Sequence, residues 1–250
     1  MNATSRLCGC VLAAALALAL AARAFAGTTD REFPVGNATA LRLNVSGSIH
    51  VIPVPGLRSV NLHVVDNGPS TPPMSISTSR SGAQLVVKIT GPSESIVPFV
   101  GASGYELQVS YPARMRLDLR EFAGRVHVER VTQPMQIYDA EGNIVVDDAA
   151  AALTAEDDAG DITVAGAHSS ITLTVGNGDV DATLAPGWRG SLVRLEASDG
   201  NLHLAVPAGF RAHYDLTSGS GTVSNPLRNV PKSPLVFMLA AQGNVSIGTL

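Results

Sequence analysis

The chain has 250 residues, of which 24 are glycine and two are cysteine, and its formal net charge is −4 at pH 7. This weakly acidic balance argues against nucleic acid as a partner, because binding to phosphates needs clustered basic side chains. The length is sufficient for one large all-β domain, or two small ones, to bury a hydrophobic core.

Residues 1–26 have the pattern of a signal peptide. Arg6 precedes the short apolar stretch "VLAAALALALAA", and the small-x-small sequence Ala24-Phe25-Ala26 matches a signal-peptidase site. The apolar stretch is shorter than the roughly 20 residues that a membrane helix needs. We therefore expect a periplasmic or secreted protein that begins at Gly27 and has no membrane span after cleavage.

Both cysteines belong to this leader. Cys8 and Cys10 precede the apolar stretch, so neither follows it as a lipid-anchor cysteine would. The mature chain then has no cysteine, which excludes disulfides, thiol catalysis and cysteine-ligated metals.

Residues 27–113 read as an irregular β segment. Its candidate strands are Leu41–Val45, Ile49–Val54, Val60–Val64, Met74–Thr78, Gln84–Thr90 and Tyr105–Tyr111. The stretch "NVSGSIHV" around Gly47 already has the pattern that is repeated later, so a first coil is expected there, with hairpins inserted before the regular repeats begin at residue 114.

The segment 91–104, "GPSESIVPFVGASG", is expected to be a loop. Its apolar tip contains Ile96, Val97 and Phe99. Such a tip can contact a partner protein if it is exposed, but we expect it to cover an open end of the solenoid.

Residues 114–250 contain a repeat marked by glycine. The glycines are Gly124, Gly142, Gly160, Gly178, Gly200, Gly221 and Gly243, at spacings of 18, 18, 18, 22, 21 and 22. Apolar residues stand two and four positions after nearly every glycine, for example Val126 and Val128, and mostly polar residues stand between them. This alternation predicts one half-buried strand per repeat.

A second alternating segment precedes each glycine, for example Leu117-Asp118-Leu119. Asp or Asn usually follows the glycine, which is typical of a tight turn. A unit of about 20 residues with two amphipathic strands cannot bury its apolar face alone, and stacking solves this problem. The sequence therefore predicts a right-handed parallel β-solenoid, with an antiparallel sandwich as the competing fold.

The end of the stack is expected to be the coil that ends the chain, "GNVSIGTL". A loop at 225–234, "NPLRNVPKSP", precedes it. This coil is expected to be covered by that loop or to remain an edge where a second copy can pair, which would make a homodimer through the solenoid end.

Acidic residues are concentrated in the repeats. Between residues 139 and 199 there are twelve acids and two arginines. In a stack, Asp161 and Asp179 occupy the same position in adjacent coils, so they are the candidate ligands for a cation such as Ca²⁺. The competing interpretation is that they shape turns.

Paired acids also allow a carbohydrate-acting enzyme, a lyase or hydrolase, because sugar hydrolysis needs two carboxyl groups about 5–10 Å apart. Asp161, Asp179 and Asp181 are the candidates for such a pair. Their turn positions and the scarcity of aromatic platforms, with Trp188 as the only tryptophan, argue against this activity. We therefore predict no catalytic residues.

The histidines show no spacing typical of zinc sites. His127 and His203 are expected in one outward column, but several coils apart. We therefore predict neither a metal site of histidines nor a cofactor.

The stretches "YELQVSYPARMRLDLREFAGRVHVERV", "DAEGNIVV", "DDAGDITV" and "SDGNLHLAVPAGFRAHYDLTSGSGTVSNP" resemble the bacterial putative-adhesin family, a domain of unknown function related to autotransporter adhesin heads. The resemblance covers residues 38–250. It implies an exported β-solenoid without known catalysis, and it assigns no residue a role.

Together these patterns divide the chain into a signal peptide (1–26), an irregular β segment with a first coil (27–113) and regular repeats (114–250). The expected function is a non-enzymatic binding or structural role at the bacterial cell envelope. The expected partner is an envelope or surface protein or a glycan.

Overall fold

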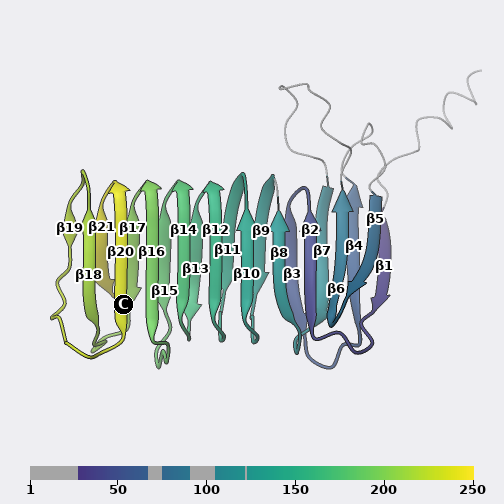
Figure 1. Ribbon diagram of the computed structural model, residues 1–250, viewed down its shortest axis with the longest axis horizontal. Coiled ribbons are helices and arrows are strands. Elements are labelled where there is room, and N and C mark those ends of the chain that lie inside the picture. The colour runs from purple at the N-terminus through teal and green to yellow at the C-terminus, as the bar shows by residue number, and fades with distance from the viewer. Residues whose placement is uncertain (1–27, 67–74, 91–104, 122) are drawn as a thin grey trace, which may run out of the picture.

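The computed structural model describes residues 28–66, 75–90, 105–121 and 123–250, which form an elongated stack of strands (Figure 1). Twenty-one strands and no helix are found in these ranges. The prediction of an all-β protein is therefore confirmed. Within the described ranges there is no helix long and apolar enough to cross a membrane.

Together with the strands of the N-terminal part, the regular repeats build two sheets, one of eleven strands and one of ten. Consecutive strands alternate between the sheets. The ten-stranded sheet receives β8 (Arg116–Glu121), β10 (Met135–Asp139), β12 (Leu153–Ala159), β14 (Ile171–Asn177) and β16 (Leu192–Asp199). The eleven-stranded sheet receives β9 (Gly124–Glu129), β11 (Gly142–Asp147), β13 (Ile162–Ala167), β15 (Val180–Leu184) and β17 (Leu202–Val206).

Neighbouring strands of the repeats run parallel and in register, so equivalent apolar residues form continuous buried columns. In the ten-stranded sheet, Leu117, Met135, Leu153, Ile171 and Val193 are paired in turn, and each is at most 2% exposed. Burying one such side chain contributes about 1.5–3 kcal/mol. Parallel stacking of the glycine-marked units is therefore confirmed, and the repeats do not form an antiparallel sandwich.

The N-terminal part contains β1 (Thr28–Pro34), β2 (Ala40–Val45), β3 (Ile49–Val54), β4 (Ser59–Asp66), β5 (Ser75–Ser81), β6 (Gln84–Thr90) and β7 (Tyr105–Pro112). The first coil is β2–β3. It lies between the β6–β7 coil on one side and β8–β9 on the other. Antiparallel pairing of β4 with β7 and β1, and of β5 with β6, completes this end of the stack (Figure 1).

The opposite end contains β18 (His213–Ser218), β19 (Val223–Ser224), β20 (Leu235–Gln242) and β21 (Val245–Thr249). Here β20 pairs with β16 and β18, and β21 pairs with β17 and β19. The outermost coil is therefore β18–β19, and the prediction that the final coil of the chain ends the stack is wrong (Figure 1).

The physical reason lies in the composition of the two coils. Strand β20, "LVFMLAAQ", buries Val236, Met238 and Ala240 completely, whereas β18, "HYDLTS", is largely polar. Placing the more apolar strand inside removes more apolar surface from water, and a polar edge strand resists pairing with other chains. Val223 stands two positions after Gly221, where the repeat pattern predicts a buried residue, but it is 47% exposed because β19 has a neighbour on one side only.

Candidate functional site

The predicted cation residues Asp161 and Asp179 lie at adjacent corners of the stack, where their side chains bind backbone amides. Asp161 Oδ1 accepts a hydrogen bond of 2.8 Å from the backbone N–H of Asp179. Asp179 Oδ1 accepts one of 2.6 Å from that of Asn201. Asn143 and Asn201 continue the ladder on either side. The turn-shaping role expected for these acids is therefore present in the structure.

Replacing Asp179 by asparagine is expected to change the free energy of unfolding by less than about 0.5 kcal/mol, because an amide oxygen can accept the same bond. Asp179→Ala is expected to lower it by about 1 kcal/mol, because the N–H of Asn201 loses its acceptor. Urea denaturation measures both values. If Ca²⁺ stabilises the wild type and not Asp179→Asn, the carboxylate holds a cation and the corner role alone is insufficient.

Of the other predicted site residues, only Asp181 lies within the described ranges. Asp181 is exposed on β15, where it pairs in register with Thr163 and His203. The loop residues Ile96, Val97 and Phe99 lie outside the described residues, as does the leader 1–26. Among the described residues, Asp181 makes no hydrogen bond to a second outward acid.

Three acids at inward-facing positions of their strands form a buried column in the ten-stranded sheet. Glu121, Asp139 and Asp157 are paired in register and are at most 1% exposed. Their burial was not predicted from the sequence. The signal was available, because Asp139 continues the inward alternation of Met135 and Ile137.

One oxygen of each buried acid accepts backbone hydrogen bonds at the corner. Glu121 Oε1 accepts bonds of 2.8 Å from both Gly47 and Ala123, and Asp157 Oδ1 accepts one of 3.0 Å from Ala159. The second oxygen of each carboxyl has no hydrogen-bond partner. This environment disfavours the charged form.

Burial is the first cause of their altered acidity. It raises the pKa of Glu121 to about 8 and that of Asp157 to about 7. The pKa of Asp139 is also raised by burial. The neighbouring Asp139 carboxyl adds to both larger shifts. The column is thus most compatible with the folded state when it is protonated.

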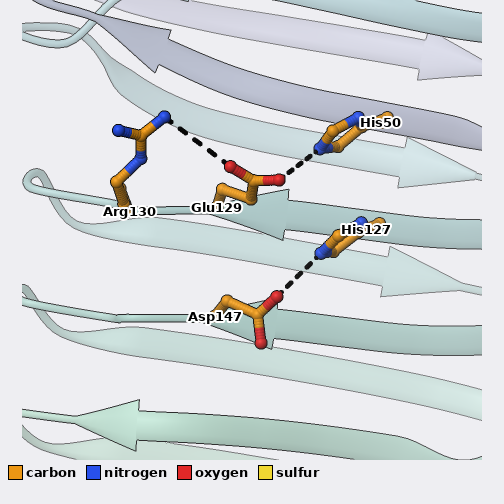
Figure 2. Close-up of polar contacts among 5 residues, drawn as sticks. All are labelled: His50, His127, Glu129, Arg130 and Asp147. Carbon is orange, nitrogen blue, oxygen red and sulfur yellow. Dashed lines mark hydrogen bonds and ion pairs between the residues drawn. The ribbon is translucent and has the colours of Figure 1, made fainter.

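The most concentrated set of metal-binding donors lies on the outer face of the eleven-stranded sheet. His50 on β3 and His127 on β9 pair in register on adjacent parallel strands. Their imidazole rings stack with centroids 4.6 Å apart and an angle of 7° between the planes. Figure 2 shows both rings pointing toward carboxylates of the neighbouring strands.

Each imidazole contacts one carboxylate. His50 Nε2 is 2.9 Å from Glu129 Oε1, and His127 Nε2 is 2.9 Å from Asp147 Oδ2 (Figure 2). Arg130 lies 3.7 Å from the other oxygen of Glu129. The side chains of His50 and Glu129 are 30% exposed and that of His127 34%, so the donors are both supported and reachable from solvent.

The donor atoms of His50, His127 and Glu129 all lie within 4.8 Å of one another. In the described part of the chain no other three histidine, cysteine or acidic residues converge in this way. The same two imidazoles line a surface depression of about 600 Å³ together with Ser48, Glu106 and Arg125. This arrangement can bind a cation, exchange protons with solvent or contact a polar ligand.

Sequence reasoning missed the histidine pair. His127 and His203 share a column, as predicted, but they are separated by β11, β13 and β15. The signal that could have found the pair is positional: His50 stands three residues after Gly47, as His127 stands three residues after Gly124.

No protein family and no curated protein matches the sequence. Among solved structures, a putative adhesin from Bacteroides fragilis superimposes with a TM-score of 0.53 at 14% identity, covering 90% of this chain and 97% of that one. The two proteins share a fold.

Two further structures align more loosely. A putative cell adhesion protein from Clostridium sporogenes has a TM-score of 0.46 at 10% identity, covering 90% of this chain and all of that one. A putative lipid binding protein from Parabacteroides distasonis has a TM-score of 0.45 at 14% identity, covering 90% and 97%. Neither contributes to the argument about function.

Proposed function

We propose that this chain is an exported, non-enzymatic right-handed β-solenoid with an adhesin-like binding or structural role at the bacterial cell envelope. The leader pattern in residues 1–26 supports export. The fold shared with the Bacteroides fragilis protein supports membership of the putative-adhesin family. Because a fold can host many functions, the proposed binding role also rests on the surface of the stack.

The observation that carries the proposal is the regular outward surface of the ten-stranded sheet. Its outward positions Gln136, Thr154, Thr172 and Arg194 pair in register from strand to strand. Parallel strands place equivalent residues about 4.8 Å apart, so hydroxyl, amide and charged groups form rows along the stack. Extended surfaces of this kind suit a long polymeric partner. A glycan chain or a surface protein fits this description.

The competing function is a carbohydrate-acting enzyme that uses the outward acids. Asp161 and Asp179 each hold a backbone amide of the next corner, which ties their carboxylates to the scaffold. This arrangement favours the binding role over catalysis.

The test uses the full chain expressed with its own leader in a Gram-negative host. The expected product is periplasmic or secreted, and mass spectrometry should place its amino terminus at Gly27. Purified protein is then presented to a glycan array, to isolated peptidoglycan and to intact bacterial cells, with release of reducing sugar measured in parallel. We expect retention by at least one of these surfaces without release of sugar.

A pair of variants identifies the face that binds. Thr154→Arg combined with Thr172→Arg alters the outer face of the ten-stranded sheet and is expected to abolish retention. Thr163→Arg alters the outer face of the other sheet and serves as the matched control. Retention by none of the surfaces contradicts the proposal, and steady release of sugar supports the enzyme instead.

A further inference from the structure

We propose that His50, His127 and Glu129 form a binding site for a divalent transition metal ion, and that Zn²⁺ is the best match to these donors. Imidazole nitrogen and carboxylate oxygen are common Zn²⁺ ligands, and a set of two histidines and one glutamate occurs in zinc sites. The site is independent of the glycan or protein surface proposed above, because it lies on the other sheet.

The distances permit coordination with small side-chain movements. Zn–N and Zn–O bonds of about 2.0–2.2 Å place the donors of a tetrahedral site about 3.4 Å from one another. The three donor atoms already lie within 4.8 Å. His50 Nε2 and Glu129 Oε1 are 2.9 Å apart. The remaining change is of the order of 1 Å, which rotation of partly exposed side chains can supply.

The backbone beneath the donors is held in place by the core. Ile49 and Val51 flank His50, Val126 and Val128 flank His127, and all four are at most 2% exposed. Because β3 and β9 pair in register, the backbone positions of the two histidines cannot separate without breaking the sheet. Little conformational entropy is therefore lost when a metal orders the site.

The contacts between histidine and carboxylate are the ones that a metal would replace. His50 Nε2 now shares a hydrogen bond with Glu129, and His127 Nε2 shares one with Asp147. On binding, Nε2 of each imidazole carries no proton and donates its lone pair to the ion, with the single ring proton on Nδ1, while Glu129 donates a carboxylate oxygen; a proton that sits on Nε2 beforehand moves to Nδ1 by exchange with solvent. Asp147, whose Oδ2 lies 2.9 Å from His127 Nε2, is a further oxygen donor.

Two other histidines of the chain each pair with a single carboxylate. His63 contacts Asp30 at 2.6 Å and His168 contacts Asp148 at 3.2 Å, each without a second histidine in the group. The stacked pair differs because two nitrogens and a carboxylate oxygen converge. A metal there would link β3 and β9, whose histidines are 77 positions apart in the sequence, and so fasten the first coil to the regular repeats.

The experiment is a titration of the tag-free, metal-stripped chain with Zn²⁺ by isothermal calorimetry, repeated with Co²⁺ and read by visible absorbance. We expect one ion per chain with micromolar affinity, and a Co²⁺ spectrum with nitrogen ligation. His127→Gln and Glu129→Gln are each expected to weaken binding at least about tenfold, because loss even of a group that orients a ligand has that effect.

His203→Gln is the matched control, because His203 occupies the same outward column and bonds to Ser246 outside the site. Circular dichroism of each variant verifies that it is folded, and ¹⁵N NMR of the histidines shows directly whether the Nε2 atoms of His50 and His127 change on addition of Zn²⁺. Binding weaker than millimolar, or binding that persists unchanged in His127→Gln, overturns the proposal. Failure of the glycan or cell binding described earlier leaves this titration unaffected.

Discussion

Raising the pH from 5 to 9 is expected to lower the free energy of unfolding by an amount on the order of 6 kcal/mol. Burial raises the pKa of Glu121 from 4.5 to about 8 and that of Asp157 from 3.8 to about 7. A group whose pKa is higher in the folded state binds more protons there than in the unfolded chain. Its stabilising effect is complete below about pH 4 and is lost as the pH rises through 7 and 8.

Urea denaturation at pH 5, 7 and 9 measures this dependence. Replacing Glu121 by glutamine and Asp157 by asparagine keeps the oxygens that accept the corner amides but removes the titration. The double variant is expected to lose most of the pH dependence and to exceed the wild type in stability at pH 9. Glu156→Gln, an exposed neighbour on β12, is the control and is expected to retain the wild-type profile.

A wild-type protein that becomes more stable between pH 5 and 9 would contradict this account of the buried column. So would a double variant with the same slope as the wild type.

Gly142→Ala is expected to lower the free energy of unfolding by at least about 3 kcal/mol. A Cβ at this position would lie 1.5 Å from the carbonyl oxygen of Gly124 and 2.9 Å from Asp139 Oδ2. The first contact is with the backbone of the adjacent coil, so relief requires the two coils to separate. Thermal and urea denaturation measure the loss.

The control is Gly248→Ala, on β21, where the nearest atom to the added Cβ is His203 Cε1 at 3.6 Å. This is an ordinary van der Waals contact, so a change below about 0.5 kcal/mol is expected. Equal stability of Gly142→Ala and the wild type would show that the coils are not in the close contact described here.

The regular part of the fold could be predicted because its information is local and repeated. The glycine spacing placed Val126, Ile144 and Ile162 in one column, and the structure pairs these residues directly. Six of the seven strands of the N-terminal segment were also predicted, because their residues alternate between turns, whereas β1 (Thr28–Pro34) was not predicted. Predicted strand 49–54 and β3 have the same bounds.

The order of the coils could not be predicted from the spacing alone. Units with the same spacing can dock in any order, and the choice between β18 and β20 as the outer strand depends on the difference in apolar surface that each would expose. The buried acids were missed for a related reason. Alternation places Asp139 inside, residue type places it outside, and the corner amides that it binds become visible only in the folded chain.

The histidine site could not be predicted for the same reason as the order of the coils. His50 belongs to the first coil and His127 to the repeats, and an intervening coil, β6–β7, lies on the far side of β3. Only the docking order brings the two rings together.

At the C-terminal end, the coil β20–β21 lies inside the coil β18–β19, although it comes later in the chain. This order affects when the end of the stack can be completed. Strands β18 and β19 leave the ribosome before β20 and β21, yet they pair with the stack only through them. The edge at β16–β17 therefore gains its native partner strands only when β20 and β21 have been synthesised. Completion of this end of the stack therefore has to follow translation of β21.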